Sequence, residues 1–215
     1  MSRKLWGRKN SSNVQKARWA LEEAGIAYEQ IDAGGPFGGL DTPAYRAMNP
    51  NGYVPTYEEE GFILWESHAI TRYVAETHAS GTLFPQDPHT RALANQWMDW
   101  MLANLNRSFL DLFWSYWRTP EAQRDMKRIA RLEREVARHM SILEAQLEGR
   151  SYLLGETLTM ADIPAGTMLY RYYEIPIERA DLPNLAGWYA RLKERAAYRE
   201  AVMVPFDDLY GRLAF

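Results

Sequence analysis

The chain has 215 residues, no cysteine and a formal net charge of -3, with 47% hydrophobic and 25% charged residues. This length suits one large domain or two small ones with cores of their own. The near-neutral charge predicts no nucleic-acid partner, and the lack of cysteine excludes disulfides, thiolate metal sites and a protein thiol nucleophile. No apolar stretch approaches the roughly 20 residues of a membrane span, and no signal-like segment follows Met1, so we expect a soluble, cytoplasmic protein.

The first eighty residues alternate strand-like and helix-like segments. Lys4 to Trp6 and Tyr28 to Ile31 predict two strands that flank a helix from about Asn13 to Gly25, which is a βαβ unit. Glycine at the end of this helix favours a left-handed C-cap. A glycine-rich segment, residues 34–39, lacks the lysine and hydroxyl of a phosphate-binding loop and predicts a flexible active-site loop.

Further along, a hairpin and a helix complete this first unit. Val54 to Tyr57 and Phe62 to Trp65 predict strands around an acidic turn, Glu58 to Gly61. A helix from Ser67 to about His78 follows. The chain is then interrupted by prolines and a glycine in residues 81–88, which indicates an interdomain linker between residues 1–80 and residues 89–215.

Helical periodicity dominates the rest of the chain and predicts an all-α second domain. The expected helices span about His89 to Trp117, Pro120 to Leu147, Ala161 to Tyr172 and Leu185 to Arg195. Most aromatic residues in the first of these predict core packing, and the surplus predicts an apolar pocket or a subunit interface.

Residues 49–67 combine several features of a ligand cradle. Asn49-Pro50-Asn51-Gly52 predicts a turn, and the Val54-Pro55 bond after it suits a cis peptide whose neighbours pair with a peptide-like ligand. Ser67 opens a helix, where orphan amides and the helix dipole attract a carboxylate. The order of these elements predicts a pocket for a small, anionic, peptide-like molecule.

Histidines do not indicate a metal site. No two of them have the spacing of a ligand pair on one helix face, and no carboxylate cluster supplies further ligands. We therefore expect no bound metal. The four are His68, His78, His89 and His139.

A small βαβ-ββα unit with Val54-Pro55 and Glu66-Ser67, followed by a helical domain, resembles the cytosolic glutathione S-transferase superfamily. The segment from Tyr152 to Asp162 also looks like that family's signature. Its residue pattern predicts a capping box formed by Thr159 and Asp162. The resemblance covers essentially the whole chain. It implies an α/β thioredoxin-like N-terminal domain and an all-α C-terminal bundle, the glutathione transferase fold.

The same resemblance implies two candidates for the group that stabilises the glutathione thiolate. Ser11-Ser12-Asn13-Val14 looks like the Ser-x-Asn-Val of serine-type plant and bacterial members, which points to Ser11. Bacterial members with disulfide reductase activity carry Thr-Pro-Asn here, which points to Asn13. The expected subgroup is therefore the bacterial serine- or asparagine-type, phi-, theta- or nu-like. The alternative is that these residues only cap the first helix.

For the ligand cradle, the resemblance implies that Val54, next to Pro55, pairs with the cysteinyl part of glutathione. Glu66 and Ser67 then bind the γ-glutamyl end of glutathione. Without the resemblance, Glu66 would be interpreted as a solvated charge and Ser67 as an N-cap. Many serine-type members carry Gln or Lys before the Val-Pro to hold the glycyl carboxylate. This chain has Tyr53 there, with Asn51 and Arg46 nearby.

Three functions remain open at this point. The first is a detoxifying transferase that joins glutathione, as co-substrate, to a small hydrophobic electrophile. The second is glutathione-dependent reduction of disulfides or peroxides, in which glutathione supplies both sulfurs. The third is a non-catalytic binding module. The resemblance also implies a homodimer.

Overall fold

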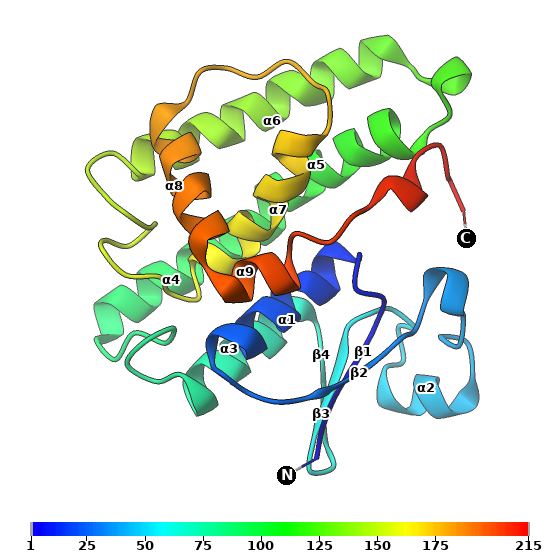
Figure 1. Ribbon diagram of the computed structural model, residues 1–215, viewed down its shortest axis with the longest axis vertical. Coiled ribbons are helices and arrows are strands. Elements are labelled where there is room, and N and C mark those ends of the chain that lie inside the picture. Colours follow the sequence, from blue (N-terminus) through cyan, green and yellow to red (C-terminus); the bar gives the residue numbers. More distant parts are fainter. Residues whose placement is uncertain (1, 215) are drawn as a thin grey trace.

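Four strands form a mixed sheet in the order β2-β1-β3-β4 in the computed structural model, which describes residues 2–214 (Figure 1). β1 runs parallel to β2 and antiparallel to β3, with Leu5 opposite both Gln30 and Tyr57. Leu5 and Tyr57 are completely buried, so they attach the sheet to the core. The strands are β1 (Arg3–Trp6), β2 (Glu29–Ile31), β3 (Thr56–Glu59) and β4 (Phe62–Trp65).

Three helices accompany this sheet: α1 (Ser12–Glu23), α2 (Pro43–Met48) and α3 (Ser67–His78). α1 ends as predicted, because Gly25 adopts φ 66° and the Ile26 amide reaches back to the Leu21 carbonyl at 3.0 Å. α2 was not predicted. Thr42 caps it by accepting from the Tyr45 amide at 3.2 Å, but six residues are too few to show helical periodicity.

The helical domain confirms the predicted fold class, with changes at the ends of its helices. Its helices are α4 (Pro88–Trp100), α5 (Asn106–Phe113), α6 (Met126–Gln146), α7 (Asp162–Glu174), α8 (Pro183–Glu194) and α9 (Ala196–Ala201). The single helix expected from His89 to Trp117 contains two π-helical turns, Met101–Leu105 and Trp114–Arg118. The helix expected from Pro120 begins only at Met126, where the Asp125 carboxylate accepts from the Arg128 amide at 3.0 Å.

The β3–β4 hairpin is tighter than predicted. Its turn consists of Glu60 and Gly61 alone, at φ 52° and 88°, a pairing of positive φ values that suits the twist of a two-residue hairpin. β3 starts at Thr56, two residues later than expected. Pro55 has no amide hydrogen to donate to the ladder, so Val54 and Pro55 stay outside the sheet.

The predicted capping box is present at the start of α7. Asp162 Oδ2 accepts from the Thr159 amide at 2.9 Å, and Thr159 Oγ1 accepts from the Ala161 amide at 3.3 Å. Asp162 Oδ1 also accepts from the Leu153 amide at 2.9 Å. Burial raises the pKa of Asp162 to about 6. The carboxyl is fully enclosed by these contacts, so its role is structural.

α1 lies between the two domains (Figure 1). It packs against α3 of its own domain and against α7 and α9 of the helical domain. Trp19 is fully buried there, and Tyr198 meets it edge to face at 4.8 Å between ring centroids. Gly166 of α7 permits this approach, because a Cβ at that position would lie 2.9 Å from the Trp19 ring.

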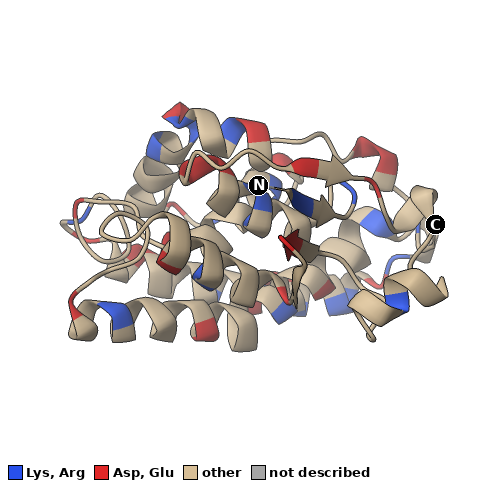
Figure 2. Ribbon diagram, turned by 90° about the horizontal axis from the view of Figure 1, so that it is seen from below, with Lys and Arg blue, Asp and Glu red and all other residues tan. Residues whose placement is uncertain are grey.

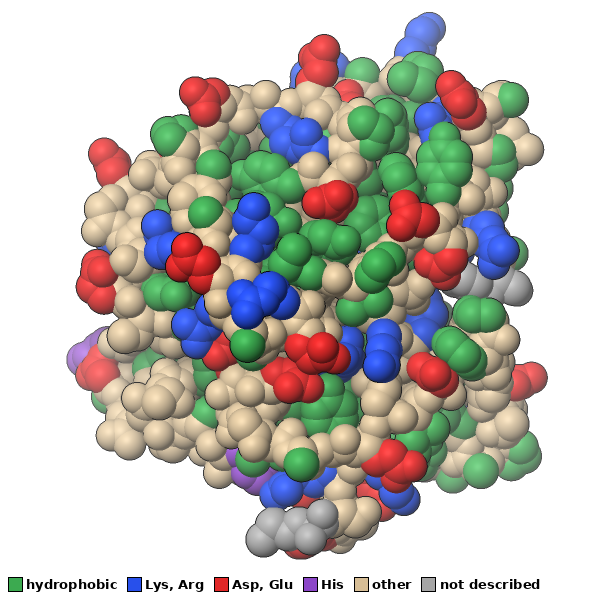
Figure 3. Space-filling view, in the orientation of Figure 1, with side chains coloured by type: hydrophobic (Ala, Val, Ile, Leu, Met, Phe, Trp, Pro, Cys, Tyr) green, Lys and Arg blue, Asp and Glu red, His purple; other side chains and the backbone are tan. Residues whose placement is uncertain are grey.

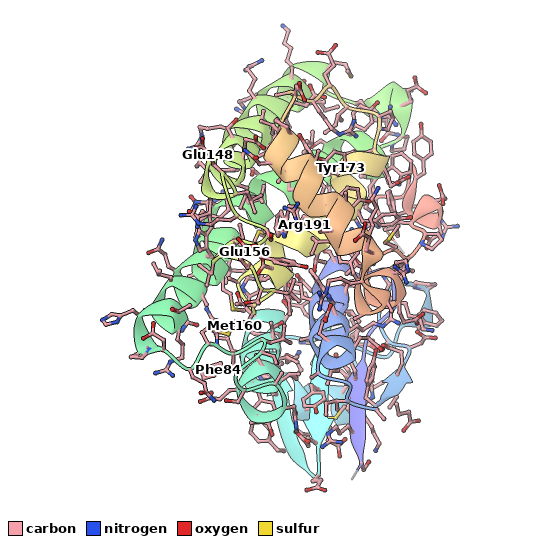
Figure 4. The ribbon with its side chains drawn as sticks, turned by 60° about the vertical axis from the view of Figure 1, so that its left-hand side comes forward. Phe84, Glu148, Glu156, Met160, Tyr173 and Arg191 are labelled. Atoms are coloured by element: carbon pink, nitrogen blue, oxygen red, sulfur yellow. The ribbon has the colours of Figure 1, made fainter. Side chains whose placement is uncertain are left out.

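Further contacts join the domains beside the linker. The Met160 amide donates to the Leu83 carbonyl at 2.8 Å, and Figure 4 shows the labelled Phe84 and Met160 close together on this side. Arg195 donates twice to the Glu23 carboxylate, at 2.7 and 2.6 Å. These contacts add to the apolar packing of α1.

Charges of both signs are interspersed over the molecule (Figures 2 and 3). No single-sign face dominates these views, in agreement with a formal net charge of -3. Within residues 2–214, every helix is too short or too polar to cross a bilayer.

We predict that Gly166→Ala destabilises the protein by about 1–3 kcal/mol, because the added methyl group collides with Trp19 in a packed interface. Gly187→Ala is the matched control. A Cβ there meets only the end of Arg191, at 3.5 Å, and replacing a helical glycine stabilises by up to about 1 kcal/mol. Urea unfolding measures both, and equal stability of the two variants would contradict the interpretation.

Candidate functional site

A small cavity of about 100 Å³ brings most of the predicted site residues together. Ser11 is the only predicted site residue that does not line it. The lining residues are Asn13, Asn49, Asn51, Tyr53, Val54, Pro55, Glu66 and Ser67. The two largest of the other cavities described, of about 500 and 450 Å³, are lined by none of these residues. The chemistry therefore selects the small cavity, although it is not the largest.

Asn49 organises the loop on one side of this cavity. It is 2% exposed, and its amide nitrogen donates to the Tyr53 carbonyl at 2.9 Å and to Thr56 Oγ1 at 3.2 Å. Its side-chain oxygen accepts from the Asn51 amide at 3.1 Å, and its carbonyl accepts from the Gly52 amide at 3.0 Å. The sequence indicated the turn but not that the Asn49 side chain would hold it. An Asx turn, in which the Asn49 side chain accepts from the amide two residues later, was the sequence pattern that could have predicted this role.

Val54 presents its main chain to the cavity. The Val54-Pro55 bond is cis, as predicted. The preceding carbonyl, that of Tyr53, is occupied by Asn49 and by the Tyr45 hydroxyl, which donates to it at 2.7 Å. Within the described residues, no hydrogen bond takes the amide or carbonyl of Val54. These two groups are consequently available to an extended ligand.

Glu66 and Ser67 form the opposite side, at the start of α3. Glu66 occupies the N-cap position with φ 73°, a left-handed conformation that costs a non-glycine residue roughly 1–3 kcal/mol. Such outliers concentrate at binding sites. Ser67 is therefore the first helical residue and not the N-cap, and the side chain of the N-cap residue Glu66 makes no capping hydrogen bond. The Ser67 hydroxyl lies beside the first-turn amides at the start of α3, and Ser67 lines the cavity.

Ser11 occupies the N-cap position of α1 but does not cap it with its side chain. Its main chain is held, because its amide donates to the Arg8 carbonyl at 3.0 Å and its carbonyl accepts from the Gln15 amide at 2.9 Å. Ser11 is only 8% exposed. The simple capping interpretation of its hydroxyl is therefore wrong, and that hydroxyl is available for another partner.

Asn13 lies in the first turn of α1 and does line the cavity. Its side-chain oxygen accepts from Lys16 Nζ at 3.2 Å, and the same ammonium donates to Asn106 Oδ1 of α5 at 3.3 Å. An ammonium group only donates, so the amide oxygen of Asn13 must face Lys16. The NH₂ group of Asn13 then points away from Lys16 and is left as a donor.

Comparisons with known proteins show to which family this chain belongs. Residues 1–76 match the family model of the glutathione S-transferase N-terminal domain, and residues 126–191 match that of the C-terminal domain. The chain is also 37% identical over 203 residues to glutathione S-transferase GstB of Escherichia coli K12, covering 94% of this chain and 98% of that protein. The chain belongs to the glutathione S-transferase family.

Solved structures agree with this assignment. A theta class glutathione S-transferase from Xanthomonas axonopodis pv. citri, with glutathione bound, superposes with a TM-score of 0.91 at 50% identity. That alignment covers 95% of this chain and 98% of the other. A glutathione transferase from Burkholderia graminis, with two glutathione molecules bound per subunit, gives a TM-score of 0.81 at 28% identity, covering 95% and 88%.

Lys16 dominates the electrostatics beneath the site of this transferase. Its side chain is completely buried, and burial lowers the pKa of Lys16 to about 7, while the nearby Glu66 carboxylate opposes the shift. His68 lies close by. Burial, with help from Lys16 and Arg72, lowers the pKa of His68 to about 2, so its ring is neutral. Sequence inspection missed Lys16 because nothing in its spacing indicates complete burial.

No group of three or more His, Asp or Glu residues that would hold a metal ion occurs within residues 2–214. The donors described around the cavity are amide, hydroxyl, carboxylate and ammonium groups. They suit hydrogen bonding to an organic ligand.

We predict that Lys16→Met changes how stability depends on pH. The unfolded lysine keeps its proton up to about pH 10.5, whereas the folded one loses it above about pH 7. Within this window the unfolded state binds more protons, so the stability of the wild type rises with pH. The Lys16 contribution to this slope is at most roughly 1.4 kcal/mol per pH unit.

Urea unfolding between pH 7 and 9 measures this difference, and Lys16→Met should show a smaller rise than the wild type. Lys127→Met, on an exposed position of α6, is the control and should keep the wild-type slope. Identical slopes for wild type and Lys16→Met would show that Lys16 titrates normally.

Proposed function

We propose that the cavity binds glutathione and that the protein conjugates its thiolate to a small electrophile with an apolar body. One observation carries the proposal: three separate segments place complementary groups around a single cavity. They are the open main chain of Val54, the α3 start with Glu66 and Ser67, and the oriented amide of Asn13. The relative from Xanthomonas axonopodis pv. citri with glutathione bound supports the choice of ligand.

The proposed contacts follow from the chemistry of glutathione. The main chain of Val54, beside Pro55, pairs with the cysteinyl residue as a strand-like partner. Ser67 and the first amides of α3 donate to the γ-glutamyl carboxylate, which the helix dipole also favours. Glu66 accepts from the ammonium of the same γ-glutamyl end. The positive φ of Glu66 is consistent with a side chain positioned for this contact.

The thiol must ionise for the reaction to proceed. A cysteine-type thiol titrates near about 8.5, and each unit of pKa lowering requires roughly 1.4 kcal/mol of preferential stabilisation of the thiolate. Asn13 lines the cavity with a donor fixed by Lys16, so we assign it the main role and Ser11 a supporting one. The thiolate then attacks the electrophile, a carbon–sulfur bond forms, and the leaving group departs with its electron pair.

The proposed site of the glycyl carboxylate lacks the Gln or Lys that many serine-type members carry before the Val-Pro, because Tyr53 occupies that position. Tyr53 lines the cavity and is 74% exposed, and Asn51 lies beside it. Arg46 donates to the Pro50 carbonyl at 2.8 Å, which holds its guanidinium against the same loop. The guanidinium packs against Gly52, because a Cβ added to that glycine would lie 2.5 Å from Arg46 Cζ. We propose that Tyr53 and Asn51 donate to this carboxylate while Arg46 supplies positive charge.

Reduction of disulfides or peroxides is the second candidate. It needs two glutathione molecules and no protein cysteine. Two observations favour it: Asn13 lines the cavity, and the Burkholderia graminis relative holds two glutathione molecules per subunit. Assaying disulfide reduction beside aryl-halide conjugation separates the two functions, because a pure transferase shows little of the former.

The proposal includes a homodimer and separate roles for the two domains. Exposed apolar side chains on the edge strand β4 and on α4, namely Phe62, Ile63, Trp65 and Leu93, support an interface between copies. We assign glutathione binding to residues 1–80 and expect the electrophile to be held beside the helical domain, residues 89–215, with residues 81–88 as linker. The helix ends at His78 and Pro88 are consistent with these limits. A cytoplasmic location and a role in detoxification stay predictions.

We predict that Asn13→Ala reduces the ultraviolet absorbance of bound glutathione thiolate more strongly than Ser11→Ala, and that the double variant abolishes it at neutral pH. Each lost donor removes roughly 1–2 kcal/mol of thiolate stabilisation, or about one pKa unit. Ser141→Ala, on an exposed position of α6, is the control. Undiminished thiolate in the double variant would refute the assignment of both residues.

Calorimetry tests the cradle separately. We predict that Glu66→Gln and Ser67→Ala each weaken glutathione binding by roughly tenfold or more, because each removes a charge-assisted hydrogen bond. Glu76→Gln, an exposed position on the same helix, should bind like the wild type. If the wild type shows no binding at millimolar glutathione, the non-catalytic module becomes the better description.

A further inference from the structure

A second cavity, of about 340 Å³, borders the loop between β1 and α1. Part of its wall comes from Arg8, Lys9 and Asn10, which directly precede the candidate thiolate residue Ser11. The remaining wall comes from the glycine-rich loop after β2 and from the segment after α9. The lining residues are Arg8, Lys9, Asn10, Asp32, Pro36, Phe37, Val204, Pro205 and Asp208.

Side-chain contacts hold these separate segments together. Asn10 Nδ2 donates to both carboxylate oxygens of Asp208, at 3.0 Å each, and the guanidinium of Arg171 donates to the Asn10 carbonyl. Figure 1 shows the red segment after α9 passing beside the blue loop between β1 and α1. The cavity is thus a junction between the loop that carries Ser11 and the helical domain.

One part of the wall is apolar. Pro36, Val204 and Pro205 line it, and Phe37 stands at its edge with 55% of its surface exposed. Phe37 belongs to the 3₁₀ turn Gly35–Phe37, closed by the Gly34 amide, which donates to the Gly38 carbonyl at 2.8 Å. Pro36 and Phe37 of the glycine-rich segment, which was expected to be an active-site loop, therefore line this cavity, while Gly34 of the same segment lies near Val54. An apolar ring or chain fits against these side chains.

The other part of the wall is charged, with two carboxylates, Asp32 and Asp208, beside two cations. Arg8 and Lys9 line the cavity, and Arg118 and Arg171 stand behind it, 3% and 4% exposed. The Arg118 guanidinium lies 3.7 Å from the Trp114 ring centroid, and that of Arg171 lies 4.6 Å from that of Phe113. Arg171 Nε is buried and has no hydrogen-bond partner among the described residues.

These guanidinium groups are close enough to affect one another. Burial, together with the charges of Arg8 and Arg118, lowers the pKa of Arg171 to about 9, against the opposing effect of Asp208. The group stays protonated at neutral pH. Four cationic side chains, Arg8, Lys9, Arg118 and Arg171, therefore accompany the two carboxylates of the lining, Asp32 and Asp208. An excess of positive charge beside a low-dielectric wall attracts anions.

We propose that this cavity binds the second substrate and that Arg8 and Lys9, backed by Arg118 and Arg171, select electrophiles that carry a carboxylate or sulfonate on an apolar body. Arg8 and Lys9 contact the anionic group directly, while Arg118 and Arg171 act through their charge. The proposal rests on the transferase function described above and specifies its substrate class. It also gives the β1–α1 loop two roles, since Ser11 faces the thiol and the three preceding residues face the electrophile.

A matched pair of substrates tests it: para-chloro-meta-nitrobenzoate and the corresponding neutral benzamide. In both, the glutathione thiolate attacks the carbon that bears chlorine, the carbon–sulfur bond forms, the carbon–chlorine bond breaks, and chloride leaves. The two compounds differ only in the charge at the far end of the ring. We expect the wild type to show a kcat/KM for the benzoate about tenfold above that for the benzamide, with the preference reduced at high salt.

Variants identify the residues responsible. Arg8→Gln should lower kcat/KM for the benzoate about tenfold and leave the benzamide within about twofold of wild type. Arg171→Gln should act in the same direction, and Arg171→Lys should restore the preference because it keeps the charge. Arg8 is partly exposed, so its substitution is a safeguard if changes at the buried Arg171 prevent folding. Arg134→Gln, exposed on α6, is the matched control and should change neither substrate.

Glutathione binding and thiolate absorbance are measured first on the same wild-type preparation. Normal thiolate with equal kcat/KM for the two substrates would overturn the anion proposal and leave the transferase function standing. The same conclusion follows if Arg8→Gln lowers both substrates equally. Absence of glutathione binding would instead contradict the transferase function, and the substrate proposal with it. Inhibition by meta-nitrobenzoate but not meta-nitrobenzamide supports the site independently of turnover.

Discussion

The burial of α1 between two domains is the constraint on which the rest of this structure depends. Its residues pack against α3 on one side and against α7 and α9 on the other. A helix enclosed in this way has almost no freedom to shift, because protein interiors are packed as densely as organic crystals. Ser11 and Asn13, at the start of this helix, are therefore held in fixed positions. The close approach of Trp19 to Gly166 is the contact that sets how near the helical domain comes.

The same enclosure explains why basic side chains are buried on both sides of the β1–α1 loop. Lys16 lies beside the proposed glutathione cradle and donates to Asn13, whereas Arg171 donates to the Asn10 carbonyl beside the second cavity. Burying a cation is costly unless its donors are used. Here the donors hold Asn13, Asn106 and the Asn10 carbonyl. Basic groups are thereby placed near the site that, by our proposals, accommodates a thiolate, carboxylates and an anionic electrophile.

Much of the fold could be predicted from local patterns. Gly25 ends α1 in the expected left-handed conformation, the Val54-Pro55 bond is cis, and Thr159 with Asp162 forms the expected capping box. The errors arose where local signals are weak. α2 is too short for periodicity, and two π-helical turns interrupt a helix whose residues all favour helix. The start of α6 was misplaced because Pro120 and Asp125 both resemble helix starts.

By itself, the sequence determined the order of elements, the family frame and most of the residues that line the cavity proposed to bind glutathione, because turns, caps and helix starts depend on neighbours within a few positions. Only the tertiary structure decided which side chain holds the loop, which of two thiolate candidates lines the cavity, and where the glycine-rich segment lies. These outcomes depend on Asn49, Lys16 and Arg171, whose partners or burial come largely from other elements. Burial and charge at such positions are properties of packing, and no local pattern in the chain encodes them.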